Sequence, residues 1–257
     1  MFNFINLNIT RSMNVNNLDN FDWGWMDNPK SLKNTIKNEK TVNGIPVGEF
    51  HKNHMIKEIF QEKQYEKVFQ VKEGDIIVDI GASVGPFTYS ILDKNPKMVY
   101  CLEPSNNEFK TITNNLGNNL NVTLINKGIT HSDCIVKSNE LFGGEEEFDG
   151  IKFSSFIEDN YIDYIDFIKT DCEGGEYYIF QDENMNFLLN NVGCIVGEWH
   201  LNSPKDKVEF RYFRDKYLKQ FKTIEVFSTD GHNIKWDLWN DHFIEYYNEI
   251  ILHISNE

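Results

Sequence analysis

The sequence predicts a doubly wound α/β domain, in which helices cover both faces of a mostly parallel, seven-stranded sheet, with an N-terminal arm and its helix in front. Short apolar runs, typical of strands buried on both faces, alternate with amphipathic stretches typical of helices. Signals for helix starts fall between these runs. The seven runs are Ile76–Ile80, Met98–Leu102, Val122–Ile125, Tyr164–Ile168, Cys194–Val196, Thr223–Phe227 and Glu249–Ile254.

An Asn-rich, irregular segment of about 50 residues precedes these runs. Its aromatic side chains, which include Phe21, Trp23 and Trp25, are too many for a free tail, so we expect the segment to pack as an arm. A helical pattern follows from about His51 to Phe69. We therefore predict an arm with its helix over residues 1–70, packed on a main domain over residues 71–257.

Three serines are predicted to begin helices. Ser105 and Ser155 each stand three residues before a glutamate, which is the capping-box pattern. Ser203 precedes a proline, as expected for an N-cap followed by the first helical residue. Near the C-terminus, five aromatic residues are spaced like those of a core-facing helix, with a platform for stacking a sugar as the alternative. These residues are Trp236, Trp239, Phe243, Tyr246 and Tyr247.

The composition restricts the possible partners. The 257 residues include 40 acidic and 25 basic side chains, which gives a formal net charge of -15. Affinity for nucleic acid comes mainly from Lys and Arg that displace counterions, so we expect neither nucleic acid nor an anionic membrane surface as a partner. An aromatic fraction of 14% supplies material for a core and excludes a wholly disordered chain.

Cysteine spacing and the N-terminal sequence bear on the cellular compartment. No two of the four cysteines have the close spacing of a zinc or redox motif, which favours a reduced protein. The first 20 residues lack the basic and apolar regions of a secretory signal. No apolar run approaches the roughly 20 residues that cross a bilayer. We therefore expect a cytoplasmic protein.

A glycine-containing turn follows the first apolar run. Gly81 and Gly85 allow the backbone to turn sharply and to approach a ligand closely. The dinucleotide fingerprint fails, because Ser83 stands at its second glycine and Pro86 at its last position. The pattern that remains is Asp-x-Gly-x-x-x-Gly, beginning at Asp79. A turn between strand and helix that binds no ligand is the alternative.

Glu103 ends the second run, 22 residues after Gly81. A carboxylate at this spacing can accept hydrogen bonds from both hydroxyls of a ribose. Alone, Glu103 would be read as a solvated strand end. Together with the glycine turn it favours a ligand site at the carboxyl ends of the strands.

Three segments carry a family resemblance: VDIGASVGPFT, CLEPS and FIKTDCEGGE. They resemble the class I S-adenosylmethionine-dependent methyltransferases and, more narrowly, the FkbM family, over roughly Gly74 to His200. The third segment matches the family signature Lys-x-Asp-x-Glu-Gly-x-Glu, which here begins at Lys169. Ser83 departs from the family, since many members have Asn there.

The resemblance implies a Rossmann-like methyltransferase fold and S-adenosylmethionine as the cofactor. Asp79 would contact its amino or carboxylate end through the loop, and Glu103 would bind the ribose hydroxyls. Asn126, at the exit of the third strand, is the expected contact on the adenine side. The implied cofactor-binding residues are Asp79, Gly81, Ala82, Ser83, Gly85, Glu103, Pro104 and Asn126.

An acidic group is predicted at the acceptor side of the cofactor. Alcohols are poor nucleophiles at neutral pH, so a base or a metal is expected beside the acceptor. Asp171 and Glu173 follow the fourth run, and Glu198 and His200 follow the fifth, at the same edge of the sheet. We predict catalytic roles for Asp171, Glu173 and His200. One divalent cation held by Asp171, Glu198 and His200 is an open hypothesis.

These observations favour an S-adenosylmethionine-dependent O-methyltransferase that acts on a hydroxyl of a small molecule or a saccharide. The family's acceptors vary, so the resemblance does not identify this one. The alternatives are a catalytically inactive cofactor-binding protein and a methyltransferase that acts on nucleic acid or protein. The failed glycine fingerprint disfavours a nucleotide-dependent oxidoreductase.

Overall fold

The computed structural model describes residue 18 and residues 20–27, 41–42, 45–138 and 146–256. The expectation that the chain lacks a secretory signal falls almost entirely on residues outside this part. Within the described part, no helix combines the length and the apolar character that a bilayer crossing requires.

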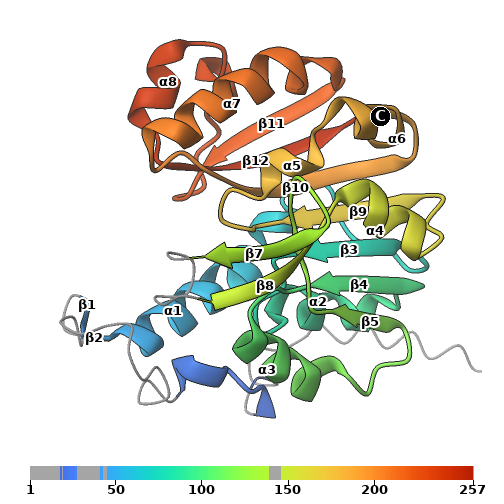
Figure 1. Ribbon diagram of the computed structural model, residues 1–257. Helices are drawn as coiled ribbons and strands as arrows, with labels where there is room; N and C mark the ends of the chain where they lie inside the picture. Colours follow the sequence, from blue (N-terminus) through green and yellow to red (C-terminus); the bar gives the residue numbers. More distant parts are fainter. Residues whose placement is uncertain (1–17, 19, 28–40, 43–44, 139–145, 257) are drawn as a thin grey trace, which may run out of the picture.

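A seven-stranded sheet forms the centre of the molecule, in the order β11-β12-β10-β9-β3-β4-β5 (Figure 1). All neighbouring strands are parallel except β12, which runs antiparallel to both β10 and β11. The predicted fold class is confirmed, and the seven apolar runs lie in strands, except that Tyr164 of the fourth run precedes its strand. The strands are β3 (Ile76–Ile80), β4 (Met98–Leu102), β5 (Val122–Ile125), β9 (Ile165–Thr170), β10 (Val192–His200), β11 (Thr223–Ser228) and β12 (Glu249–Ser255).

The strand order places a ligand site between β3 and β9. From β3 the chain proceeds to β4 and β5 on one side, whereas β9 and β10 lie on the other side. Connections that leave in opposite directions open a crevice at the carboxyl ends of the two central strands. The glycine turn after β3 and the acidic residues after β9 therefore meet at this edge.

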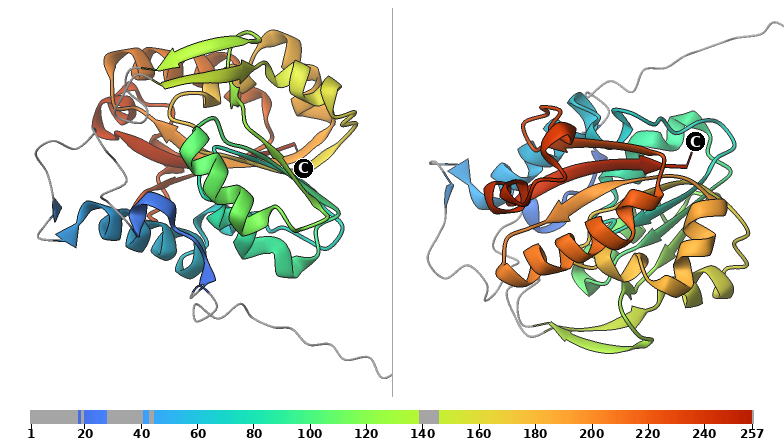
Figure 2. Two further views of the ribbon diagram at one scale, coloured as in Figure 1. Left: turned by 60° about the horizontal axis from the view of Figure 1, so that its bottom comes forward. Right: turned by 90° about the horizontal axis from the view of Figure 1, so that it is seen from above.

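Helices cover both faces of the sheet (Figure 2). Successive strand residues point to opposite faces: Ile77 packs in one apolar cluster with helices α2 and α3, and Val78 packs in the other with helices α4 to α7. The bounds are α2 (Pro86–Ile91), α3 (Asn106–Leu116), α4 (Phe153–Asp159), α5 (Glu176–Ile179), α6 (Asp182–Asn190), α7 (Pro204–Lys216) and α8 (Asp241–Tyr246), with 3-10 turns η6 (Leu92–Lys94), η7 (Leu218–Gln220) and η8 (Lys235–Asp237).

The described part of the arm packs beside α2. Phe21, Trp23 and Met26 are buried against Val84 of the glycine turn, and the Phe21 ring lies 4.9 Å from the Tyr89 ring. A boundary between arm and main domain near residue 70 stays a prediction. The arm elements are η2 (Gly24–Met26), β1 (Thr41–Val42), β2 (Ile45–Pro46), α1 (Val47–Met55), the π-helix η4 (Ile56–Gln61) and the 3-10 turn η5 (Gln64–Glu66).

The arm helix differs from the predicted one. It begins at Val47, before the expected start at His51, and passes into the π-helix η4. Lys63 then adopts a left-handed conformation with φ 50°, which ends the helical run well before Phe69.

Two of the three predicted helix starts are confirmed. Ser105 caps α3, and Ser203 caps α7 in a full capping box. The prediction for Ser155 is wrong, because α4 begins at Phe153 and Ser155 lies inside it. Asp133 explains the earlier start: its carboxylate accepts the backbone N–H of Lys152 (2.6 Å) and the Ser155 hydroxyl (2.7 Å). This cap comes from a distant segment, so the local sequence does not predict it.

The C-terminal aromatic segment is not one core-facing helix, and that prediction is wrong. The segment divides into η8 and α8, because the Asn240 side chain starts a new helix by accepting the backbone N–H of His242. Phe243 is fully buried, but Trp236 is 81% exposed and Tyr246 is 79% exposed.

A second, three-stranded sheet was not predicted. It has the order β6-β8-β7 and lies in front of the main sheet in Figure 1. Two of its strands are short or polar and lack the apolar runs that mark the seven main strands, but the third begins with the run Cys134–Val136, which the prediction of seven strands left out. The three strands are β6 (Gly128–Ile129), β7 (Cys134–Ser138) and β8 (Glu146–Ile151).

The capping box of α7 gives a first testable prediction. Ser203→Ala is expected to lower the free energy of unfolding by about 1 kcal/mol, because the backbone N–H of Asp206 loses its acceptor. Ser203→Asp retains an acceptor and should keep most of the stability. Urea denaturation followed by circular dichroism measures both variants. An unchanged midpoint for Ser203→Ala would contradict the assignment of this cap.

Candidate active site

The glycine turn is fixed by close packing at the carboxyl end of β3. Gly81 and Gly85 have φ angles of 73° and 90°, a region that disfavours other residues. A Cβ atom on Gly81 would lie 1.8 Å from the backbone oxygen of Asp171, and one on Gly85 would lie 2.7 Å from the Leu116 side chain. Both glycines are therefore needed to bring the turn against the end of β9 and against α3.

A buried ion pair between Lys169 and Asp79 stabilises the glycine turn. The Lys169 ammonium lies 3.3 Å from Asp79 Oδ1 and donates a hydrogen bond to the Gly81 carbonyl oxygen (2.7 Å). Asp79 is fully buried and also accepts the Thr88 hydroxyl (2.8 Å). The Asp79 side chain thus contacts other groups of the protein. Its predicted contact with the cofactor through the loop stays a prediction. The family signature contained Lys169, but the sequence did not assign it a role.

Glu103 lies against the turn and is 3% exposed. Its carboxylate accepts the backbone N–H of Ser83 (2.8 Å) and that of Ser105 (2.7 Å). Burial raises the pKa of Glu103 well above its usual range and the charge of Glu108 adds to this, whereas the two N–H groups act in the opposite direction. The predicted juxtaposition of Glu103 and the glycine turn is therefore present.

Polar groups at the turn fit a ligand that carries hydroxyls. The Ser83 hydroxyl is buried and has no hydrogen-bond partner among the described residues, although buried polar groups nearly always have one. Each oxygen of an ionised Glu103 carboxylate accepts one N–H and has a further lone pair. Both groups can therefore bind a ribose-bearing cofactor in addition to their present contacts.

Three further predicted cofactor residues surround Glu103. Ala82 is buried in the turn, and Pro104 follows Glu103 directly. The Asn126 side chain donates to the carbonyl oxygens of Glu103 (2.8 Å) and Pro104 (3.2 Å). The Asn126 amide nitrogen thus fixes the backbone after β4, and its predicted adenine contact stays a prediction.

Asp171 directly follows β9 and lies beside the turn. Its Oδ2 atom accepts the hydroxyl of Tyr65 (3.0 Å) and lies 4.0 Å from the Lys169 ammonium. Tyr65 belongs to η5 of the arm, so the arm contributes to the site. The sequence did not predict this residue, because a contact across 106 positions leaves no local pattern.

His200, the last residue of β10, is surrounded by carboxylates. Its Nδ1 lies 3.4 Å from Glu176, and its Nε2 lies 3.3 Å from Glu249 and 3.5 Å from Glu173. Burial alone would lower the pKa of His200, but hydrogen bonds with Glu176 and Glu249 raise it to about 12. The imidazole is therefore held protonated at neutral pH. A general base must be unprotonated, so these surroundings do not favour that role for His200.

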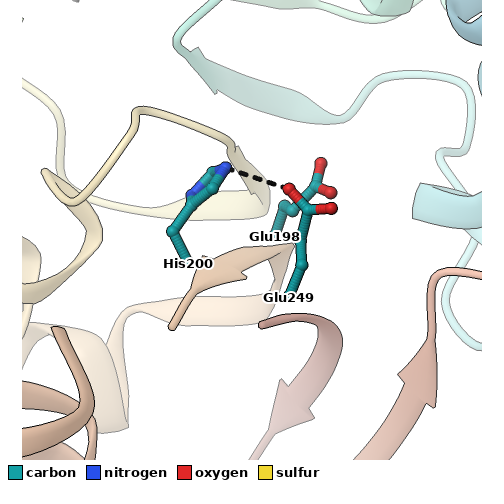
Figure 3. A group of neighbouring side chains, drawn as sticks. All are labelled: Glu198, His200 and Glu249. Atoms are coloured by element: carbon teal, nitrogen blue, oxygen red, sulfur yellow. Dashed lines mark ion pairs between the residues drawn. The ribbon is translucent and has the colours of Figure 1, made fainter. Parts of the chain in front are cut away.

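Glu198, His200 and Glu249 converge at this edge (Figure 3). One candidate ligand atom from each lies within 4.8 Å of the others. Burial, together with the charges of Asp171 and Glu249, raises the pKa of Glu198 to about 10. The sequence grouped Asp171 with Glu198 and His200, but in the structure Asp171 lies outside this cluster and Glu249 takes its place. Glu249 was missed because the antiparallel direction of β12 brings the start of that strand to this edge.

The fold and the site together define a class I methyltransferase: β12 runs antiparallel in an otherwise parallel sheet, a glycine turn follows the central strand, and an acidic residue ends the next one. Residues 79–227, more than half of the chain, match the Methyltransferase FkbM domain. The chain therefore belongs to the FkbM family of S-adenosylmethionine-dependent methyltransferases, as its three motifs predicted. No curated protein sequence gave a significant match.

Solved structures agree with this fold. Methyltransferase FkbM from Methylobacillus flagellatus is 13% identical, with a TM-score of 0.51 over 78% of this chain and 47% of that one. The present chain thus spans about half the length of that protein. Two other structures have lower scores. The fibrillarin/Nop5p complex is 14% identical, with a TM-score of 0.49 over 86% of this chain and 90% of that one. Aeropyrum pernix fibrillarin with S-adenosylmethionine is 13% identical, with a TM-score of 0.45 over 76% of this chain and 74% of that one.

Proposed function

We propose that this chain binds S-adenosylmethionine at the glycine turn and methylates a hydroxyl of a small molecule or a saccharide. The observation that carries the proposal is the arrangement beside the acidic edge of Glu103 and the Ser83 hydroxyl, for which the described residues supply no hydrogen-bond partner. When bound, the cofactor supplies an electrophilic methyl group. The protein positions the acceptor, excludes water and takes up the acceptor's proton.

Roles on the cofactor side follow from the contacts. Glu103 accepts hydrogen bonds from the ribose hydroxyls, and Ser83 supplies its free hydroxyl. Lys169 holds the Gly81 carbonyl oxygen and thereby the shape of the turn. Asp79 acts through Lys169 and not by direct contact. The remaining predicted cofactor residues line this site or fix its backbone. They are Gly81, Ala82, Gly85, Pro104 and Asn126.

Asp171 is the best placed group to receive the acceptor's proton. Its side chain is 30% exposed beside the turn, and the Tyr65 hydroxyl and the Lys169 ammonium keep it oriented. His200 and Glu173 lie on the far side of the same edge. There they are placed to orient the acceptor through hydrogen bonds, and the Glu173 carboxylate is largely exposed.

The charge at this edge favours an acceptor without phosphate groups. Partly exposed carboxylates of Asp171, Glu173 and Glu249 surround the site and would repel the phosphates of a nucleic acid. Trp236 and Trp239 are exposed, but the chain has turned back along β11 before it reaches them, since the backbone N–H of Ile234 donates to Val226. Their place at this edge, and with it a sugar-stacking role, stays a prediction.

Transfer of a labelled methyl group tests this function. The full chain is incubated with methyl-labelled S-adenosylmethionine and with hydroxylated small molecules, saccharides, RNA or protein. We expect label on the oxygen of a hydroxyl compound or a saccharide. Label on RNA or protein alone would contradict the proposed acceptor class. Cofactor binding without transfer to any acceptor would favour an inactive cofactor-binding protein.

Glu103→Ala tests the ribose contact. We expect S-adenosylmethionine to bind about tenfold to a hundredfold more weakly, because the hydrogen bonds between the Glu103 carboxyl group and the ribose hydroxyls are lost. Calorimetry measures the affinity, and circular dichroism verifies the fold. Glu73→Ala is the matched control, since Glu73 is exposed and precedes β3 at the opposite edge of the sheet. Equal affinities of the two variants would contradict the assignment of Glu103.

A further inference from the structure

We propose that Glu198, His200 and Glu249 bind one divalent cation of the Mg²⁺ or Mn²⁺ class, on the acceptor side of the cofactor site. The candidate ligand atoms of all three lie within 4.8 Å of one another. They come from the adjacent strands β10 and β12, where His200 pairs directly with Glu249. Figure 3 shows the three side chains rising from the same side of these strands. A rigid strand pair therefore presents the ligands.

The surroundings of Glu198 point to a positively charged ligand. Glu198 is only 7% exposed, yet in the described part of the chain no nitrogen donor forms a hydrogen bond or an ion pair with its carboxylate. Its carboxyl group forms a hydrogen bond with that of Glu249, which requires a shared proton, because two ionised acids at such close range would repel each other. A buried carboxylate group of this kind requires a bound cation or shared protons.

Glu176 orients the imidazole for metal binding. Glu176 is fully buried, and its Oε1 atom accepts the backbone N–H of Cys172 (3.0 Å), which fixes its position. The same oxygen lies 3.4 Å from His200 Nδ1. Histidine ligands of metals typically donate one ring nitrogen to a carboxylate and bind the metal through the other. Here the other nitrogen, Nε2, faces Glu249 (3.3 Å), and a cation bound between them would replace the proton that Nε2 carries in the metal-free protein.

The chemistry of the three ligands determines which class of cation fits the site. Two carboxylates favour a hard, oxygen-preferring ion, and a single imidazole is acceptable to Mn²⁺. Three protein ligands leave coordination positions open for water or for a substrate oxygen. The side chain of Glu249 is 36% exposed, so the site is accessible from the acceptor side. A role in activating the acceptor hydroxyl rests on the proposed function, but cation binding does not.

Titration of the metal-free full chain with Mn²⁺ tests the site, with free Mn²⁺ followed by electron paramagnetic resonance and heat by calorimetry. We expect one Mn²⁺ per chain, displaced by Mg²⁺. Glu198→Gln and Glu249→Gln should each weaken binding at least tenfold. Glu176→Gln, a positioning residue, should weaken it roughly tenfold to a hundredfold. Glu73→Gln, remote from the site, should leave it unchanged.

Two results would overturn the cation site. The first is the absence of stoichiometric Mn²⁺ binding, which would leave shared protons as the alternative. The second is Mn²⁺ binding that Glu198→Gln and Glu249→Gln leave unchanged. Glu249 is partly exposed, so its variant is expected to fold even if the Glu198 variant does not. Titration of S-adenosylmethionine into the same samples separates the two proposals. Cofactor binding without Mn²⁺ binding overturns the cation site alone, and Mn²⁺ binding without cofactor binding overturns the proposed function alone.

Discussion

Lys169→Met is expected to lower the free energy of unfolding by about 3–5 kcal/mol, because it leaves a buried carboxylate without its partner. Lys169 is 4% exposed and Asp79 is fully buried, and their charged atoms lie 3.3 Å apart. The variant also releases the Gly81 carbonyl oxygen, so S-adenosylmethionine should bind more weakly. Urea denaturation at neutral pH measures the loss of stability, and calorimetry measures the change in affinity.

Two further variants control this prediction. Asp79→Asn, introduced into the Lys169→Met protein, removes the unpaired charge and should restore much of the stability. Lys137→Met breaks an exposed ion pair with Glu147 (2.8 Å), which solvent screens, and should leave the stability almost unchanged. If Lys169→Met costs no more than Lys137→Met, the pair with Asp79 does not hold the turn.

His253 is expected to make the protein sensitive to acid. The side chain is fully buried, and burial lowers its pKa to about 4; the charge of Lys67 adds to this, and contact with the backbone of Gln64 acts in the opposite direction. In the unfolded chain a histidine titrates near 6.5. The unfolded state therefore binds more protons between these values, so the contribution is complete above about pH 6.5 and is lost as the pH falls towards 4. The loss is about 3 kcal/mol.

Comparison with His253→Leu isolates this contribution from the other groups that titrate in acid. The free energy of unfolding is measured between pH 7.5 and pH 4.5 for the wild type and the variant. The wild type should lose more stability on acidification, with the difference confined to the window between about pH 6.5 and 4. His242→Leu, at an exposed position of α8, should follow the wild type. Parallel curves for the wild type and His253→Leu would show that the pKa of His253 is not lowered.

The main sheet could be predicted because its strands are buried on both faces, so that their position is encoded in short apolar runs. The direction of β12 is not encoded in its run, and its antiparallel course brings Glu249 beside His200. In the small sheet, β6 and β8 lack such runs, and the run Cys134–Val136 of β7 is not buried on both faces, since Ile135 is exposed. Helix starts were predicted where the cap is local, as at Ser203, and not where a distant side chain such as Asp133 supplies it.

The site shows the same division between local and distant determinants. The glycine turn is a local motif, and Glu103 follows it at a fixed offset, so both could be placed from the sequence. The contacts of Lys169 with Asp79 and of Tyr65 with Asp171 depend on how distant segments pack. A sequence pattern identifies the residue types at this edge but does not show which carboxylates surround His200.

Calorimetric titration of the folded chain with S-adenosylmethionine and, separately, with NAD tests the central claim most directly. The arrangement of Glu103, Ser83 and the glycine turn predicts saturable binding of one S-adenosylmethionine per chain and no heat with NAD, whose fingerprint the turn lacks. Binding of NAD without binding of S-adenosylmethionine would contradict the account.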